Sequence, residues 1–199
     1  MITIDAIGID CPKPVIMAKK ELDKMAEGVV EILADNAVCV QNLIKLAESN
    51  GFKYDHKQES EDRFIVHIYK NEEGSSGDEV KTSQPVNDDF TIAIGSRYFG
   101  DGDDVLGEIL MKSFIYTVTE TEPLPKTIVF YNSGVYLTVK DSPVLDDIRV
   151  LAENGVEIIS CGTCLDFFGL KEELAVGEIS NMYTIYEAIK NAGRNMVIG

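Results

Sequence analysis

The amino-acid sequence predicts an α/β protein with two domains: an N-terminal βαβαββ two-layer sandwich and a C-terminal doubly wound three-layer α/β domain. Residues 1–70 alternate strand-like and helix-like hydrophobic patterns and close with a hairpin pattern. Residues 90–199 repeat a strand-then-helix alternation in which several strands are apolar on both faces, as buried parallel strands are. Residues 71–89 have only Val80 and Val86 as apolar residues and are rich in Gly, Ser, Asp and Glu, which predicts a flexible linker.

The elements of the N-terminal domain follow from hydrophobic periodicity and capping signals. Ile2 and Ile4 alternate with polar residues as in a strand, and the apolar residues of 15–25 then recur at helical spacing. A second strand leads into a second helix, which Asp35 or Asn36 is placed to cap. A hairpin completes the domain. The expected strands are 2–6, 29–34, 53–59 and 63–70.

The C-terminal domain is predicted from its regular alternation. Strands are expected over residues 90–95, 126–132, 156–160, 175–179 and 195–198. Helices are expected near residues 103–119, 143–154, 165–173 and 182–192. Doubly wound domains place their sites at the carboxyl ends of the strands, and Ser96-Arg97, Asn132-Ser133 and Cys161 all follow such ends.

Composition excludes some classes of partner. The formal net charge is −16, and no stripe of Lys and Arg residues could neutralise a row of phosphates, so nucleic acid is not expected to bind. No run approaches ~18 apolar residues, and the N-terminus lacks the basic start of a signal peptide. We therefore expect a cytoplasmic protein without a membrane partner, in which the four cysteines are thiols.

Cys11 is the strongest functional signal. It stands between the first strand and the first helix and is followed by Pro12-Lys13-Pro14, with the prolines expected at the first and third helical positions. Cysteine is a poor N-cap, so stability alone would not select it there. Unpaired N–H groups, the positive helix end and Lys13 should stabilise a thiolate or a persulfide anion. Cys11 is the predicted nucleophile, and Pro12, Lys13 and Pro14 its predicted binding residues.

With this Cys-Pro-Lys-Pro motif after the first strand, residues 1–70 resemble the TusA/SirA-like sulfurtransferase family. The resemblance implies that Cys11 accepts a persulfide and relays its sulfur. It also implies two partners, a sulfur or selenium donor protein such as a cysteine desulfurase and a downstream chalcogen acceptor. Residues 90–199 resemble a DsrE-type α/β domain, a family that also handles sulfur on cysteine. The combination, including Cys-Gly-Thr-Cys-Leu-Asp-Phe-Phe-Gly-Leu, is similar to the YedF proteins associated with selenium metabolism; a homo-oligomer through the C-terminal domain is left open.

Cys161 and Cys164 form a C-x-x-C motif between a strand and an expected helix, a place where thiols become acidic. A zinc site is disfavoured because the chain has one such motif and two scattered histidines, and no metal is expected. A thioredoxin-like centre is disfavoured because no proline follows Pro143 to face the cysteines. A sulfur or selenium acceptor pair matches both the location and the resemblance.

Arg97 follows the first strand of the C-terminal domain, where it could pair with an anionic persulfide or selenide near Cys161 or form a surface salt bridge. Cys39 lies among apolar residues of the second helix and is interpreted as a small buried hydrophobe. His56 and His67 are expected to pack across neighbouring strands, without a catalytic role.

The preferred function is a sulfurtransferase-like carrier that needs no cofactor. Cys11 takes sulfane sulfur or selenium from the donor, and a thiolate of Cys161 or Cys164 attacks the outer atom. Two alternatives remain open. One is an adaptor or redox-sensing regulatory module, and the other is a dithiol oxidoreductase at Cys161 and Cys164.

Overall fold

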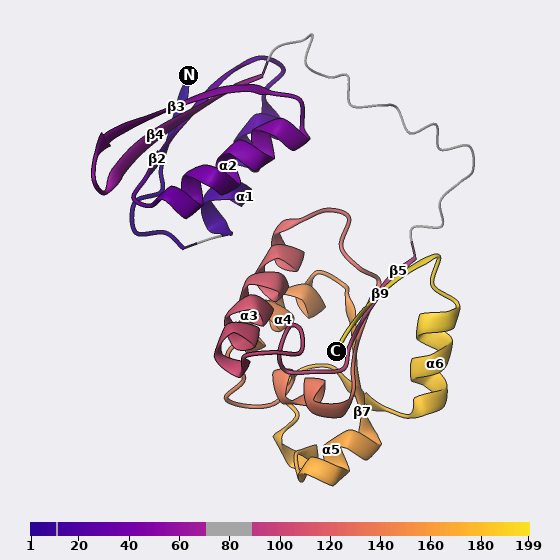
Figure 1. The fold of residues 1–199 in the computed structure, drawn as a ribbon. Helices are drawn as coiled ribbons and strands as arrows, with labels where there is room; N and C mark the ends of the chain where they lie inside the picture. The colour runs from indigo at the N-terminus through magenta and orange to yellow at the C-terminus, as the bar shows by residue number, and fades with distance from the viewer. Residues whose placement is uncertain (11, 71–88) are drawn as a thin grey trace. The chain divides into compact units, whose positions relative to one another are not determined.

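The computed structural model describes residues 1–10, 12–70 and 89–199, and it confirms the mixed α/β fold (Figure 1). The chain divides into two compact units, Met1–Lys81 and Thr82–Gly199. Cys11 and residues 71–88 of the predicted linker lie outside the described residues.

The N-terminal unit has the predicted βαβαββ order (Figure 1). Its sheet has the order β1-β2-β4-β3, with β1 parallel to β2 and the other pairs antiparallel. Both helices cover one face of this sheet, because the side chains of alternate strand positions point toward them and are buried with their apolar residues. The elements are β1 (Ile2–Asp5), α1 (Lys13–Lys24), β2 (Gly28–Ala34), α2 (Ala37–Ser49), β3 (Lys53–Ser60) and β4 (Arg63–Lys70).

The two N-terminal helices begin differently: α2 has a side-chain cap, whereas α1 has none. Asn36 caps α2, because its side-chain oxygen accepts a hydrogen bond from the Cys39 backbone N–H at 2.8 Å. Cys39 itself is 1% exposed, as its interpretation as a core residue requires. Pro12 is the N-cap of α1 and Pro14 its second helical residue, so the expected first and third positions are wrong by one residue.

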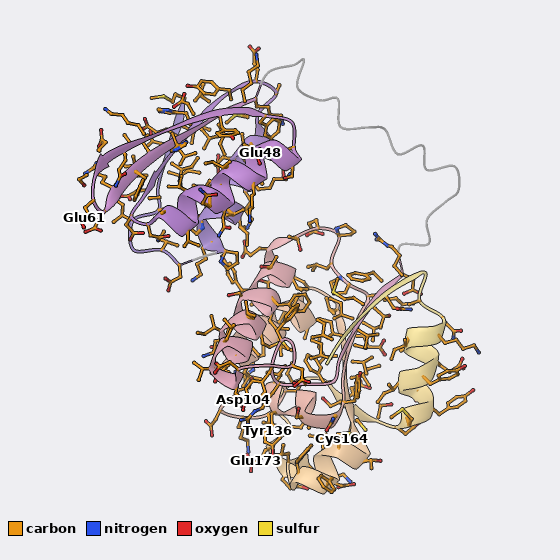
Figure 2. The ribbon with its side chains drawn as sticks, viewed as in Figure 1. Glu48, Glu61, Asp104, Tyr136, Cys164 and Glu173 are labelled. Atoms are coloured by element: carbon orange, nitrogen blue, oxygen red, sulfur yellow. The ribbon has the colours of Figure 1, made fainter. Side chains whose placement is uncertain are left out.

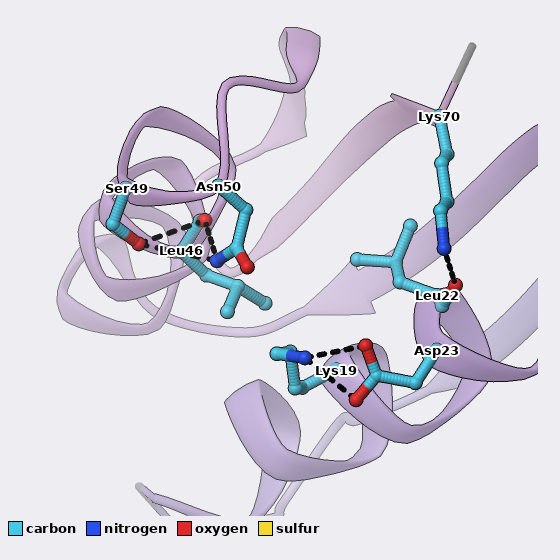
Figure 3. Close-up of polar contacts among 7 residues, drawn as sticks. All are labelled: Lys19, Leu22, Asp23, Leu46, Ser49, Asn50 and Lys70. Atoms are coloured by element: carbon cyan, nitrogen blue, oxygen red, sulfur yellow. Dashed lines mark hydrogen bonds and ion pairs between the residues drawn. The ribbon is translucent and has the colours of Figure 1, made fainter. Parts of the chain in front are cut away.

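Side chains also satisfy carbonyl groups near the ends of both helices (Figure 3). In α2, the Ser49 hydroxyl and the Asn50 side-chain amide both donate to the Leu46 carbonyl, at 3.1 and 2.9 Å. Lys70, the last residue of β4, donates to the Leu22 carbonyl of α1 at 2.8 Å. This contact ties the last turn of α1 to a strand that is distant in sequence.

The open face of the N-terminal sheet carries a polar row that crosses all four strands. Thr3 pairs with Glu31, Glu31 with His67, and His67 with Asp55 in the strand register. The Thr3 hydroxyl donates to Glu31 at 3.0 Å, and the two ring nitrogens of His67 lie 3.1 Å from Glu31 and 2.9 Å from Asp55. Both nitrogens can donate to a carboxylate only when the imidazole is protonated. Both hydrogen bonds of His67 in this row therefore require its imidazolium form.

This row predicts a pH-dependent stability of the N-terminal unit. The Asp55 carboxylate, followed by Glu31, raises the pKa of His67 against the opposing effect of burial. A raised folded-state pKa stabilises the fold fully below the ordinary histidine pKa of about 6.5, and the contribution is lost as the pH rises through the folded value. We expect a loss of no more than about 1 kcal/mol, because these side chains are partly solvated. This loss is measured by urea unfolding of the full chain, monitored through the NMR signals of residues 1–70.

The variant His67→Gln is the control for this pH dependence. Its midpoint of urea unfolding should be the same at pH 6 and pH 8.5. A small difference from the wild-type midpoint that is equal at both pH values is expected from the substitution itself. If the wild-type protein shows no loss of stability over that range, or if the variant shows the same loss, the row does not act through the His67 imidazolium.

The C-terminal unit is a parallel sheet of order β8-β7-β6-β5-β9 between helical layers. Figure 1 shows α3 and α4 on one side of the sheet and α6 on the other, with α5 at its lower end. The elements are β5 (Phe90–Ile94), α3 (Asp104–Glu120), β6 (Thr127–Phe130), η2 (Asn132–Leu137), α4 (Leu145–Glu153), β7 (Glu157–Cys161), α5 (Gly162–Phe168), η3 (Lys171–Glu173), β8 (Glu178–Ser180), α6 (Met182–Lys190) and β9 (Arg194–Ile198).

The predicted helix over residues 165–173 is wrong at both ends. Helix α5 begins at Gly162, and it ends at Phe168 because Gly169 takes the left-handed conformation (φ 68°) that terminates helices. A separate short 3-10 helix, η3, follows. Cys164 is consequently inside the helix instead of before it. In the described ranges, no helix is both long enough and apolar enough to cross a membrane.

Candidate functional site

The carboxyl edge of the C-terminal sheet brings together segments that follow β5, β6 and β7. Strands β5, β6 and β7 are adjacent and parallel, so their carboxyl ends meet at one edge. The backbone N–H of Tyr131 donates to the Ile94 carbonyl at 3.0 Å and holds the end of β6 against β5. Asn132 then adopts a left-handed φ of 48°, and η2 turns back over the edge.

A glycine allows η2 to lie directly on this edge. A Cβ atom at Gly134 would stand 2.2 Å from the Ile94 carbonyl oxygen, a distance that no side chain can occupy. The obstacle is backbone, which cannot rotate away as a flexible side chain could. The close approach of η2 to β5 therefore depends on the absence of a side chain at Gly134.

The C-x-x-C thiols lie at the end of β7 and in the first turn of α5. Cys161 is the last residue of β7 and is 2% exposed, whereas Cys164 is half-buried. The Cys161 thiol is close enough to raise the pKa of Cys164. The backbone N–H of Asn132 donates to the Cys164 sulfur at 3.1 Å, so the loop after β6 contacts the outer thiol of the pair. Both cysteines are free thiols.

The protonation of Cys164 differs from the sequence expectation of acidic thiols. Burial raises the pKa of Cys164 above its usual value, and the neighbouring Cys161 thiol raises it further. The Asn132 N–H lowers the pKa but only partly offsets these effects. Cys164 is therefore mainly a thiol at neutral pH, and its thiolate is formed within a site that already has one backbone donor for the anion.

A buried pair of hydroxyl groups joins β7 to the residue that follows η2 and was not identified from the sequence. Thr138 and Ser160 are both fully buried, and their hydroxyl oxygens are 2.9 Å apart. Ser160 precedes Cys161 on β7, and Thr138 follows η2, donating to the Val135 carbonyl at 3.0 Å. This pair links η2 to β7 beneath the edge. A polar residue within an apolar strand was the only sequence signal for it.

Arg97 lies at the same edge, but its guanidinium is placed against aromatic rings. Its carbon is 4.7 Å from the Tyr98 ring centre and 5.5 Å from that of Tyr136, and it donates a hydrogen bond to the Tyr98 hydroxyl. The Arg97 backbone N–H donates to the Ser133 hydroxyl at 3.3 Å. Its side-chain contacts are thus with tyrosines and not with either cysteine of the motif.

The three residues after Cys11 are also placed by the structure. Pro12 is half-buried and its carbonyl accepts hydrogen bonds from Val15 and Ile16 at 3.1 and 3.2 Å, while Lys13 is exposed and Pro14 is buried. The first turn of α1 contains no acidic residue. The positive end of the helix is therefore not neutralised by a carboxylate within that turn. Beside it lies a groove of about 460 Å³, lined by Pro12, Val15, Asn42, Lys45, Leu46 and Ser49.

Comparisons with known proteins find one family match in the N-terminal part of the chain and another in the C-terminal part. Residues 2–70 match the family described as Sulfurtransferase TusA, and residues 114–198 match the DsrE/DsrF-like family. A protein of Methanocaldococcus jannaschii, whose name proposes a sulfur carrier, is 35% identical over 34% of this chain and 91% of its own length. A similarly named protein of Archaeoglobus fulgidus is 34% identical over 34% of this chain and 92% of its own length.

Among solved structures, a SirA-like protein from Desulfitobacterium hafniense is 45% identical to this chain, covering 35% of it and 96% of the other chain with a TM-score of 0.34. The sequence relationship to the two archaeal proteins extends over nearly their whole length. The chain therefore belongs to the TusA family of sulfurtransferases through its N-terminal domain, which it joins to a C-terminal DsrE-like domain.

Proposed function

We propose that this protein is a sulfur or selenium carrier in which Cys11 is the first carrier and the Cys161–Cys164 pair is the acceptor. The observation that carries the proposal is the relationship of residues 2–70 to the TusA family and to two archaeal proteins named as proposed sulfur carriers. In this proposal residues 1–70 and 90–199 are separate domains, joined by a linker over 71–89.

Loading of Cys11 is a thiolate reaction. The Cys11 thiolate attacks the outer sulfur of a persulfide on a donor protein such as a cysteine desulfurase. The sulfur–sulfur bond of the donor breaks, Cys11 becomes Cys11–S–SH, and the donor leaves as a thiolate. The positive end of α1, without a carboxylate in its first turn, would stabilise the anionic forms of Cys11, and Lys13 supplies a cation beside it.

Transfer to the C-terminal domain repeats this reaction with Cys164 as the nucleophile. The Cys164 thiolate attacks the outer atom of Cys11–S–SH, so the new persulfide forms on Cys164 and Cys11 is released as a thiolate. Cys164 is the better candidate of the pair because it is half-buried, whereas Cys161 is 2% exposed. The Asn132 N–H on the Cys164 sulfur would stabilise the attacking thiolate.

The proximity of the two thiols favours one alternative, a dithiol oxidoreductase. Cys161 and Cys164 are adjacent and reduced, and their oxidation to a disulfide would need no sulfur from Cys11. The second alternative is an adaptor or redox-sensing module, in which neither reaction is part of the function. Selenium uses the same thiolate chemistry as sulfur, and the similarity to YedF proteins is the reason to include it.

Intact-mass spectrometry after incubation with a cysteine desulfurase and cysteine tests the proposed function. The wild-type chain should gain increments of ~32 Da, and Cys11→Ser should gain none during the first turnovers. Cys39→Ser is the matched control and should load as the wild type does. An increment that persists in Cys11→Ser would contradict the assignment, and a loss of ~2 Da alone would support the oxidoreductase. Repetition with selenocysteine in place of cysteine tests selenium, because the desulfurase then carries a perselenide whose outer atom the Cys11 thiolate can attack.

A further inference from the structure

A second cavity at the carboxyl edge of the C-terminal sheet is separate from the thiol pair. Its volume is about 220 Å³, and it lies between the segment that follows β5 and the segment that connects η2 to α4. Leu137 and Val139, which are 3% and 5% exposed, supply apolar lining. Arg97, Tyr136 and Asp141 line it as well. Its size is below that of pockets for drug-sized molecules, so it fits a ligand of few atoms.

The direct side-chain contacts of Arg97 in this cavity are with neutral aromatic groups, and the charges of Asp104 and Glu108 act on it without an ion pair. The Arg97 guanidinium packs against the rings of Tyr98 and Tyr136 and donates one hydrogen bond to the Tyr98 hydroxyl. Across the described ranges, no carboxylate forms an ion pair with Arg97 within 4 Å. Several N–H donors of the guanidinium therefore remain for a ligand, and their planar fork matches a carboxylate.

The other charges in the lining leave one carboxylate without an ion pair. Glu108 is paired with Lys112 at 2.7 Å, and Lys140 is paired with Glu173 at 3.2 Å. Asp141, at a left-handed φ of 64°, has no ion pair in the part of the chain that the structure describes. Among the charged lining residues, Arg97 and Asp141 are thus the two without an ion pair, one positive and one negative. A dianion such as phosphate would be repelled by the carboxylates, whereas a zwitterion is matched by both groups.

The cavity is connected to the thiol site by aromatic packing. The ring of Tyr136 lies 5.1 Å from the ring of Phe168, which belongs to α5, the helix that carries Cys164. Figure 2 shows Tyr136 and Cys164 at the same end of the C-terminal domain. A residue that lines the cavity is therefore in aromatic contact with the helix that carries the outer thiol.

We propose that this cavity binds a small zwitterionic amino acid of about the size of cysteine. Arg97 binds the carboxylate, Asp141 binds the ammonium group, and Leu137 and Val139 contact the short side chain. The proposal concerns binding alone, and it holds whether or not sulfur moves from Cys11 to the C-terminal thiols.

Three unreactive probes test this assignment in the full chain. L-2-aminobutyrate has the shape of cysteine without its thiol, butyrate has only the carboxylate, and propylamine has only the ammonium group. Ligand-observed NMR titration should give saturable binding of L-2-aminobutyrate, with the two single-charge probes weaker by about tenfold or more, the loss expected for one charge-assisted contact. Equal affinity for butyrate and L-2-aminobutyrate, or no saturable signal for the latter, overturns the proposal.

Variants of the two charged residues provide the second measurement. Arg97→Gln and Asp141→Asn should each weaken L-2-aminobutyrate binding by about tenfold, and asparagine retains the tolerance of aspartate for a left-handed backbone. Arg149→Gln is the control, since Arg149 is paired with Asp146 on α4 and does not line the cavity. Circular dichroism melting checks that each variant is folded. Unchanged binding in both folded cavity variants would also overturn the proposal.

Discussion

Labelled sulfur that is loaded on Cys11 is expected to appear on residues 161–164. When both C-terminal cysteines are replaced, the label should remain on Cys11. The sequence predicts a flexible linker over residues 71–89, and such a linker keeps two tethered groups at an effective concentration in the millimolar range. Intramolecular attack on the Cys11 persulfide should then compete with release to the solution. We expect the lifetime of the label on Cys11 to increase about tenfold or more in the double variant Cys161→Ser, Cys164→Ser.

The two single-cysteine variants show which of the two thiols receives the label. Cys164→Ser should block the arrival of label, because Cys161 is 2% exposed and is covered by the edge of the sheet. Cys161→Ser should still accept label on Cys164. Because the pKa of Cys164 is raised, the thiolate is a minor species at neutral pH, and arrival of label should accelerate from pH 7 to pH 8.5.

Peptide mapping of the labelled protein after quenching with an alkylating reagent measures the transfer. Cys39→Ser serves as the control, because Cys39 is 1% exposed in the core of the N-terminal domain and should not affect either rate. If label never reaches residues 161–164 in the wild type, and its lifetime on Cys11 is the same in the double variant, the two domains do not exchange sulfur. The thiol pair would then be a dithiol centre of its own.

Gly134→Ala should destabilise the C-terminal domain by about 3 kcal/mol, the upper part of the range for overpacking of a well-packed interior. The added Cβ would lie 2.2 Å from the Ile94 carbonyl oxygen, so η2 must move away from the end of β5. That movement would also disturb the Asn132 N–H that contacts Cys164. Calorimetry of the full chain should show a fall of roughly 10 °C in the midpoint of the C-terminal transition.

Gly102→Ala is the matched control for this substitution. No heavy atom lies within 4 Å of a Cβ at Gly102, in a loop of the same domain. The control should change stability by no more than about 0.5 kcal/mol, and loss of chain entropy in the unfolded state favours a small gain. If Gly134→Ala melts at the same temperature as Gly102→Ala, η2 moves without loss of stability, and the close approach of η2 to β5 does not require a glycine at this position.

The order of the elements could be read from the sequence because it depends on local periodicity. Ile2 and Ile4 alternate, and the apolar residues of α1 and α2 recur at helical spacing, so each segment carries the pattern of its own buried face. The βα position of the Cys-Pro-Lys-Pro motif follows from the same patterns. Cap positions were harder to predict, since Pro12, expected as the first helical residue, is the N-cap, and α1 begins at Lys13.

Contacts between distant segments were decided by the tertiary structure. The row from Thr3 to Asp55 requires the register of four strands, which no local pattern specifies. Arg97 could be placed at the carboxyl edge from its position after a strand, but its packing against Tyr136 depends on how η2 folds back. The raised pKa of Cys164 also depends on distant segments. The position of the thiol after a strand predicted a lowered pKa, but burial by the surrounding segments raises it and has the larger effect. The sequence by itself thus determined the fold class and the order of the elements. The tertiary structure decided which side chains are neighbours, since solvent exclusion and strand register arise only when segments that are far apart in the chain pack together.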